Sequence, residues 1–78
     1  MELRIYTDTL NRQPLTQWLG ELKDIRARAQ IRARLSRVGA GNLGDCKPLR
    51  DGVHELRIDY GPGYRVYFTQ RGMEVVIL

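Results

Sequence analysis

Apolar and polar residues alternate at the start of the chain and again near its end, and between these regions they follow a helical spacing. In the opening run MELRIY, Leu3 and Ile5 alternate with charged neighbours, which predicts a half-buried strand. Alternation returns over residues 53–60 and 64–69, and residues 73–78 are almost wholly apolar. We expect these last three segments to form an antiparallel meander whose final strand is central or covered.

Two helical segments separate the first strand from the meander. Pro14 suits the first position of a helix, and large apolar residues follow at helical spacing. These core candidates are Leu15, Trp18, Leu19 and Leu22. Asp24 is expected to cap a second helix, which Gly39 and Gly41 end. The apolar stripe of that helix consists of Ala27, Ile31, Leu35 and Val38.

The segment between the second helix and the meander is rich in turn-forming residues. It reads GAGNLGDCKPL over residues 39–49 and has no periodicity, so it is interpreted as a loop. The sequence therefore predicts one α+β domain over residues 1–78. The expected order is β-α-α-β-β-β, with an antiparallel sheet and a helical hairpin packed on one of its faces.

Arginine dominates the charge of the chain, whose formal net charge is +4. The planar guanidinium grips phosphate or carboxylate in a bidentate way better than lysine does, so a nucleic acid or an acidic partner is indicated. The excess lies on the second helix, and the candidate RNA-binding residues there are Arg26, Arg28, Arg32, Arg34 and Arg37. A plain solvated helix face is the alternative interpretation.

Several classes of protein and site are not expected. The single Cys46 cannot form an intramolecular disulfide, and no signal peptide or membrane helix is recognised, so a soluble protein of the reducing cytoplasm is predicted. One cysteine and one histidine cannot make a tetrahedral zinc site, and no metal or cofactor is expected. A nucleophilic pair of Cys46 and His54 lacks any activating context.

The stretch HELRIDYGPGYRVYF carries the most specific chemistry. If its apolar positions face the helices, Arg57, Arg65 and Tyr67 emerge together on the open face of the sheet. Attack of a ribose 2′-hydroxyl on its phosphate needs stabilisation of negative charge, which arginines supply, and proton transfer. His54, the adjacent Glu55 and Tyr67 are the candidates for proton transfer. From the pattern alone, ordinary surface residues paired with Glu55 and Asp59 are the favoured interpretation.

The region from Trp18 to Phe68 resembles the RelE/ParE superfamily of toxins from type II toxin–antitoxin modules, in particular the HigB-like branch of addiction-module killer proteins. The resemblance rests on the WL, RARA and GN-GD-K elements followed by V-ELRI-YGPGYRVYF. It implies a RelE-like microbial RNase fold. It also implies an mRNA interferase, an endoribonuclease that cuts mRNA on the ribosome, inhibits growth and is silenced by a cognate antitoxin.

The resemblance also assigns roles to individual residues. It makes Arg57 and Arg65 the cations that act on the scissile phosphate, and Lys47 a contact to the RNA backbone. Proteins of this superfamily often act through Arg, Lys and Tyr without a histidine–glutamate pair, which keeps Tyr67 a catalytic candidate.

In one respect the chain departs from the superfamily. Its relatives continue past the last strand, whereas this sequence stops at Leu78, so either a truncated gene or a shortened member is expected. An apolar final strand with nothing beyond it favours a homodimer or a bound antitoxin. Two alternative functions follow from the same resemblance. They are a ParE-like inhibitor of DNA gyrase and a catalytically inert module that only binds the antitoxin or the ribosome.

Overall fold

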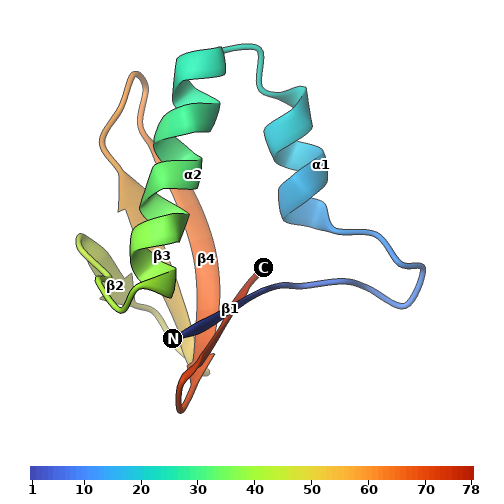
Figure 1. Cartoon of the computed structure of the whole chain (residues 1–78), viewed down its shortest axis with the longest axis vertical. Coiled ribbons are helices and arrows are strands. Elements are labelled where there is room, and N and C mark those ends of the chain that lie inside the picture. Colours follow the sequence, from blue (N-terminus) through green and yellow to red (C-terminus); the bar gives the residue numbers. More distant parts are fainter.

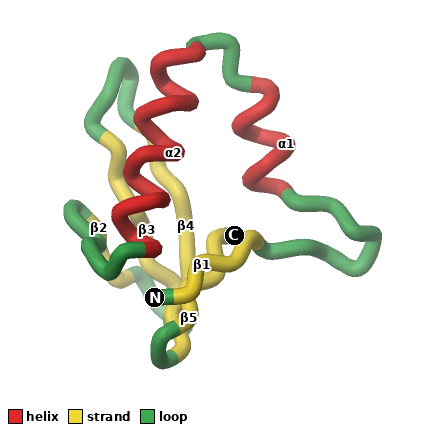
Figure 2. Tube along the Cα trace, viewed as in Figure 1, coloured by secondary structure: helices red, strands yellow, loops and turns green.

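The computed structural model describes all residues from 1 to 78 as two helices and one five-stranded sheet. The elements in chain order are β1 (Glu2–Ile5), α1 (Pro14–Glu21), α2 (Ile25–Gly39), β2 (Cys46–Pro48), β3 (Val53–Ile58), β4 (Tyr64–Arg71) and β5 (Glu74–Ile77). Helix α2 lies over β3 and β4, and α1 stands beside α2 (Figure 1). The long connection between β1 and α1 extends away from the sheet (Figure 2).

The sheet is mixed, with the strand order β1-β5-β4-β3-β2. Its β2–β3, β3–β4 and β4–β5 pairs are antiparallel, whereas β1 pairs with β5 in parallel. In that parallel pair Leu3 lies opposite Val75 and Ile5 lies opposite Ile77, so the apolar residues of both strands share the helix-covered face. The nearly all-apolar β5 is therefore central, as predicted from its composition.

The expected β-α-α-β-β-β order with an antiparallel sheet is wrong, and so is the RelE-like fold that was expected with it. Residues 46–48, expected as part of a loop, form the edge strand β2, and β1 adds a parallel strand at the opposite edge. Strand β2 is only three residues long and contains Pro48, which an edge strand tolerates because one side of its backbone needs no partner. The coarser prediction of an α+β domain is confirmed.

The helix boundaries follow from the residues that precede and end each helix. The Asp24 side chain caps α2 by accepting hydrogen bonds from the backbone N–H groups of Arg26 at 3.0 Å and Ala27 at 3.2 Å. Pro14 opens α1, as predicted, and Leu22 has an extended backbone that ends it. All four residues of the predicted α2 stripe are buried, so that prediction is confirmed.

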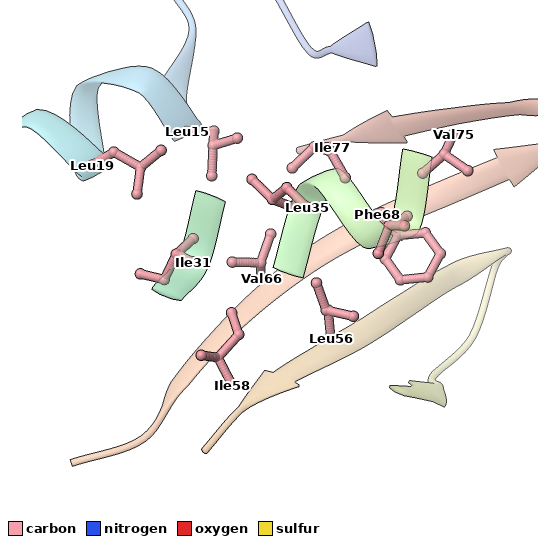
Figure 3. Packing of buried hydrophobic residues seen from close by; sticks show 11 residues of the cluster. Leu15, Leu19, Ile31, Leu35, Leu56, Ile58, Val66, Phe68, Val75 and Ile77 are labelled. Carbon is pink, nitrogen blue, oxygen red and sulfur yellow. The ribbon is translucent and has the colours of Figure 1, made fainter. Parts of the chain in front are cut away.

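The core lies between the two helices and the sheet face they cover, where side chains from α1, α2, β3, β4 and β5 point toward one another (Figure 3). Phe68 is fully buried in this cluster, as are Leu56 and Val75 from the neighbouring strands. Trp18 is only partly buried at the margin of this cluster, so the leucines of α1 belong to the core more fully than the indole does. Neither helix has the length and apolar character needed to cross a membrane.

Candidate nucleic-acid interface

The sheet face that the helices leave open carries the cations predicted from the hairpin sequence. The register of β3 and β4 places Arg57 directly opposite Arg65 and Glu55 directly opposite Tyr67. Because side chains alternate along a strand and the intervening residues are buried, these four project together on the open face. We call the following set the basic sheet face: Lys47, Glu55, Arg57, Arg65 and Tyr67. The predicted convergence of Arg57, Arg65 and Tyr67 is confirmed.

Glu55 organises the basic sheet face. Its Oε1 accepts a hydrogen bond from Nε of Arg57 at 3.1 Å and lies 4.0 Å from Nε of Arg65. The Glu55 side chain is 12% exposed, against 46% for Arg57 and 69% for Arg65. One sheltered carboxylate thus holds Arg57 in place, while the Arg65 guanidinium remains the more accessible cation.

Lys47 reaches the same face from β2. It lies opposite Glu55 in the β2–β3 register and is exposed, whereas its neighbour Cys46 lies opposite Leu56 and packs against the core. The formation of β2 thus adds a third cation beside Glu55. The loop expected from the sequence could not have predicted this placement, because it gave Lys47 no register.

His54 does not join these residues. It lies opposite Phe68 in the β3–β4 register, and their rings are stacked with centroids 5.1 Å apart and an interplanar angle of 13°. Its Nδ1 atom is buried without a hydrogen-bond partner. The predicted catalytic role of His54 therefore has no geometric support, because the side chain is on the opposite face of the sheet from Arg57 and Arg65.

Among the helix arginines, Arg34 is distinguished by a guanidinium that hydrogen-bonds to backbone carbonyls of the protein. Its Nη1 atom donates to the carbonyl of Leu43 at 2.9 Å, and its Nη2 atom donates to the carbonyls of Asp45 at 3.1 Å and Arg57 at 3.2 Å. The guanidinium thereby joins α2 to the loop before β2 and to the end of β3. Gly44 makes this approach possible, since a Cβ atom there would lie 2.5 Å from Nη1 of Arg34.

The other predicted helix arginines are dispersed. Arg37 lines a groove of about 320 Å³ that Arg57 also lines, so it is near the basic sheet face. Arg26 and Arg32 are exposed and line no groove with Arg57, and Arg28 is half-buried with its Nε atom unpartnered. The five helix arginines therefore do not form one site with the sheet arginines.

A larger groove of about 690 Å³ lies at the turn end of the β3–β4 hairpin, and we call it the hairpin groove. Its lining residues are Trp18, Asp45, Arg57, Ile58, Asp59, Pro62, Gly63, Tyr64 and Arg65. The turn itself is made by glycines, with Gly61 at φ 58° and Gly63 at φ 87°, values that other residues adopt at a cost. Two of the three cations of the basic sheet face, Arg57 and Arg65, therefore line this groove, whereas Lys47 does not.

Two features of this region were not singled out from the sequence. Strand alternation puts Glu55 on the face of Arg57, but the sequence did not indicate that its carboxylate lies close to both Arg57 and Arg65. Asp45 comes from a loop, and no periodicity could have placed it against β3, where its carbonyl accepts the N–H of Arg57 at 3.0 Å. No three His, Cys, Asp or Glu side chains gather closely enough to hold a metal ion.

Comparison with known proteins places the chain beside a relative of no stated activity. An uncharacterised protein of Haemophilus influenzae strain Rd is 53% identical over 62 residues. The match covers 78% of this chain and 63% of the relative, so the chain spans less than two thirds of that protein's length. No protein-family model matches the chain. No solved structure matches it either.

Proposed function

We propose that the protein is the toxin of a type II toxin–antitoxin module, an endoribonuclease that cuts mRNA on the ribosome and thereby inhibits growth. The observation that carries the proposal is the cross-strand pair of Arg57 and Arg65, held on an open face by the single carboxylate of Glu55. The resemblance of the hairpin sequence to HigB-like toxins supports the same assignment. A cognate antitoxin and a cytoplasmic location are parts of this proposal.

The two arginines have different roles in the proposed reaction. Arg65, the more exposed, binds a non-bridging oxygen of the scissile phosphate, and Arg57 adds a second charge from a fixed position. Both stabilise the negative charge that accumulates on the five-coordinate phosphorus as the 2′-oxygen attacks. The O2′–P bond forms, the P–O5′ bond breaks, and the products are a 2′,3′-cyclic phosphate and a free 5′-hydroxyl.

Glu55 and Tyr67 supply the proton transfers. The Glu55 carboxylate accepts the proton of the attacking 2′-hydroxyl, and the Tyr67 hydroxyl donates a proton to the departing 5′-oxygen. They lie directly opposite each other on neighbouring strands, which suits two groups that act on the same phosphate. Lys47 contacts the flanking backbone. His54 has no part in the reaction, because the sheet separates it from these groups.

Induced expression of variants in bacteria tests the proposal. Arg57→Ala and Arg65→Ala should each relieve growth inhibition and spare ribosome-bound mRNA, since each removes a charge from the transition state. The matched control is a pair of exposed helix arginines, Arg26→Ala and Arg32→Ala, which should leave toxicity in place. Circular dichroism of each purified variant checks that it is folded.

Three outcomes would contradict the proposal. Growth inhibition that persists in both the Arg57→Ala and the Arg65→Ala variants would contradict the assignment of these arginines to the active site. DNA-damage signalling with intact mRNA would instead indicate a gyrase inhibitor of the ParE type. Tight binding to an antitoxin without any RNA cleavage would indicate an inert binding module.

A further inference from the structure

The hairpin groove combines groups that the proposed cleavage reaction does not use. The half-buried Trp18 ring of α1 meets the Tyr64 ring of β4 edge to face, with centroids 6.1 Å apart and an interplanar angle of 64°. Both rings line the same groove as Arg57 and Arg65. An aromatic wall beside a pair of cations matches the two recurrent requirements of single-stranded nucleic acid, stacking for a base and positive charge for a phosphate.

Two carboxylates complete the lining. Asp45 and Asp59 are exposed, and neither side chain forms an ion pair or a side-chain hydrogen bond. A groove that served only a phosphate would gain nothing from negative charge, which repels it. An ionised carboxylate can only accept hydrogen bonds, so these residues suit a ligand that brings donors as well as a phosphate.

The size and mixed character of the groove fit one nucleotide. Its volume of about 690 Å³ is within the usual range of about 300 to 1,000 Å³ for sites that bind small molecules. Asp45 is held beside β3 by its own backbone, since its carbonyl accepts the N–H of Arg57 and a hydrogen bond from Arg34. The position of Asp45 in the groove therefore does not depend on a bound ligand.

We propose that the hairpin groove is a base-recognition subsite for one nucleotide of single-stranded RNA. Arg57 and Arg65 bind its phosphate, and the Trp18 ring stacks on its base. The carboxylates of Asp45 and Asp59 accept hydrogen bonds from an exocyclic amino group. Bases that carry this group, such as cytosine and guanine, are selected over uracil and hypoxanthine, which lack it. This subsite deepens the proposed RNA-cleaving function and rests on it for the choice of RNA as ligand.

The fluorescence of Trp18 reports directly on the subsite, because it is the only tryptophan of the chain. The full chain is titrated with CMP and UMP, and then with GMP and IMP, two pairs in which an amino group is present or absent. Stacking should quench the emission, and CMP and GMP should bind about fivefold or more tightly than their partners. Titration of N-acetyltryptophanamide under the same conditions corrects for absorption by the nucleotides.

Variants identify the groups responsible. The double variant Asp45→Asn, Asp59→Asn should keep the quenching but lose the preference for amino-bearing bases, since each amide replaces an acceptor with a mixed group. Inorganic phosphate should compete with CMP without quenching. Arg57→Ala with Arg65→Ala should weaken all four nucleotides, whereas Arg26→Ala with Arg32→Ala, outside the groove, should change none of them.

The outcomes separate this subsite from the cleavage function. Equal binding of CMP and UMP, or a preference that survives the double asparagine variant, would overturn the proposed base recognition. Absence of quenching while RNA cleavage persists would show that RNA binds elsewhere, and would overturn the subsite but not the endoribonuclease. Selective, Asp-dependent quenching in a protein that cuts no RNA would support the subsite and contradict the proposed function.

Discussion

The arginines of α2 and those of the basic sheet face differ in what their guanidinium groups contact. On α2, Arg34 donates hydrogen bonds to three backbone carbonyls and joins the helix to the sheet. On the basic sheet face, Arg65 has only the Glu55 carboxylate nearby, at 4.0 Å, and is 69% exposed. The same side chain is a structural cross-link in the first region and an available cation in the second.

The number of arginines on an element therefore does not indicate how much positive charge it offers to a ligand. Helix α2 has more of them, but the guanidinium of Arg34 is occupied by backbone carbonyls of the protein itself. The sheet has fewer, yet its register places two of them side by side and partly unpaired. Available positive charge therefore depends on which hydrogen-bond acceptors the fold brings to each guanidinium.

The largest expected effect comes from removing the one carboxylate that the sheet arginines share. Glu55→Gln should lower the rate of RNA cleavage by about 100-fold or more, because it removes the proposed proton acceptor. RNA binding should not weaken, since the change removes a negative charge from the face. Single-turnover cleavage assays at saturating protein separate the two effects. An unchanged cleavage rate would contradict the role of Glu55.

The second prediction breaks the structural cross-link. Arg34→Met should lower the free energy of unfolding by about 2 to 3 kcal/mol, because three carbonyls lose a charged donor. For a domain of this size the melting temperature should fall by about 8 to 24 °C. Arg32→Met, on the same helix but exposed, is the matched control and should change stability by less than about 0.5 kcal/mol. Equal melting temperatures for the two variants would show that the Arg34 contacts contribute little.

A third prediction concerns the opposite face of β3. His54→Phe keeps a ring stacked on Phe68 and removes a buried nitrogen that has no hydrogen-bond partner. Stability should therefore rise by up to about 1 kcal/mol, as measured by urea unfolding. Growth inhibition should be unchanged. A folded His54→Phe variant that no longer cuts RNA would restore His54 as a catalytic residue.

The smallest effect is expected in the loop before α1, where an arginine is held by a carboxylate. The pKa of Asp8 is lowered from its ordinary value chiefly by the backbone N–H of Arg12, and further by the Arg12 side chain and the backbone N–H of Leu10. The carboxylate thus stabilises the fold above the pKa of the unfolded state, about 3.9, and this stability is lost as the pH falls through the folded-state value.

Asp8→Asn should therefore flatten the fall in melting temperature between about pH 5 and pH 2, where the Asp8 carboxylate takes up its proton. Glu21→Gln, at the end of α1, is the control for the loss of one exposed negative charge outside this loop. Identical profiles for the wild type and Asp8→Asn would show that these hydrogen bonds do not persist in solution.

The elements that could be predicted from the sequence are those whose signals are local. The α2 stripe and its Asp24 cap depend on spacing and on a single side chain, and both are confirmed. The face shared by Arg57 and Arg65 follows from alternation across a short turn. The parallel pairing of β1 with β5 could not be predicted in this way, because it joins opposite ends of the chain.

In the candidate site, too, the local features could be predicted from the sequence and the contacts between distant parts of the chain could not. Strand alternation places His54 and Arg57 on opposite faces of the sheet. The prediction of a catalytic His54 was wrong to rely on the general suitability of histidine for proton transfer instead of this alternation. The role of Arg34 depends on carbonyls from a loop and a distant strand, so its position beside the stripe looked no different from that of Arg28. The position of Asp45 could not be predicted either, because it lies in a loop and its contact with β3 has no local sequence signal.

The central claim is that the basic sheet face, and not α2, is the surface that binds and cuts RNA. Binding of a fluorescent single-stranded RNA across a range of salt concentrations measures how many phosphates each surface neutralises, with a slope of about 0.7 per phosphate. Arg57→Ala with Arg65→Ala should reduce that slope by about 1.4 and abolish cleavage. Arg26→Ala with Arg32→Ala should leave both nearly unchanged, and the reverse result would contradict the account.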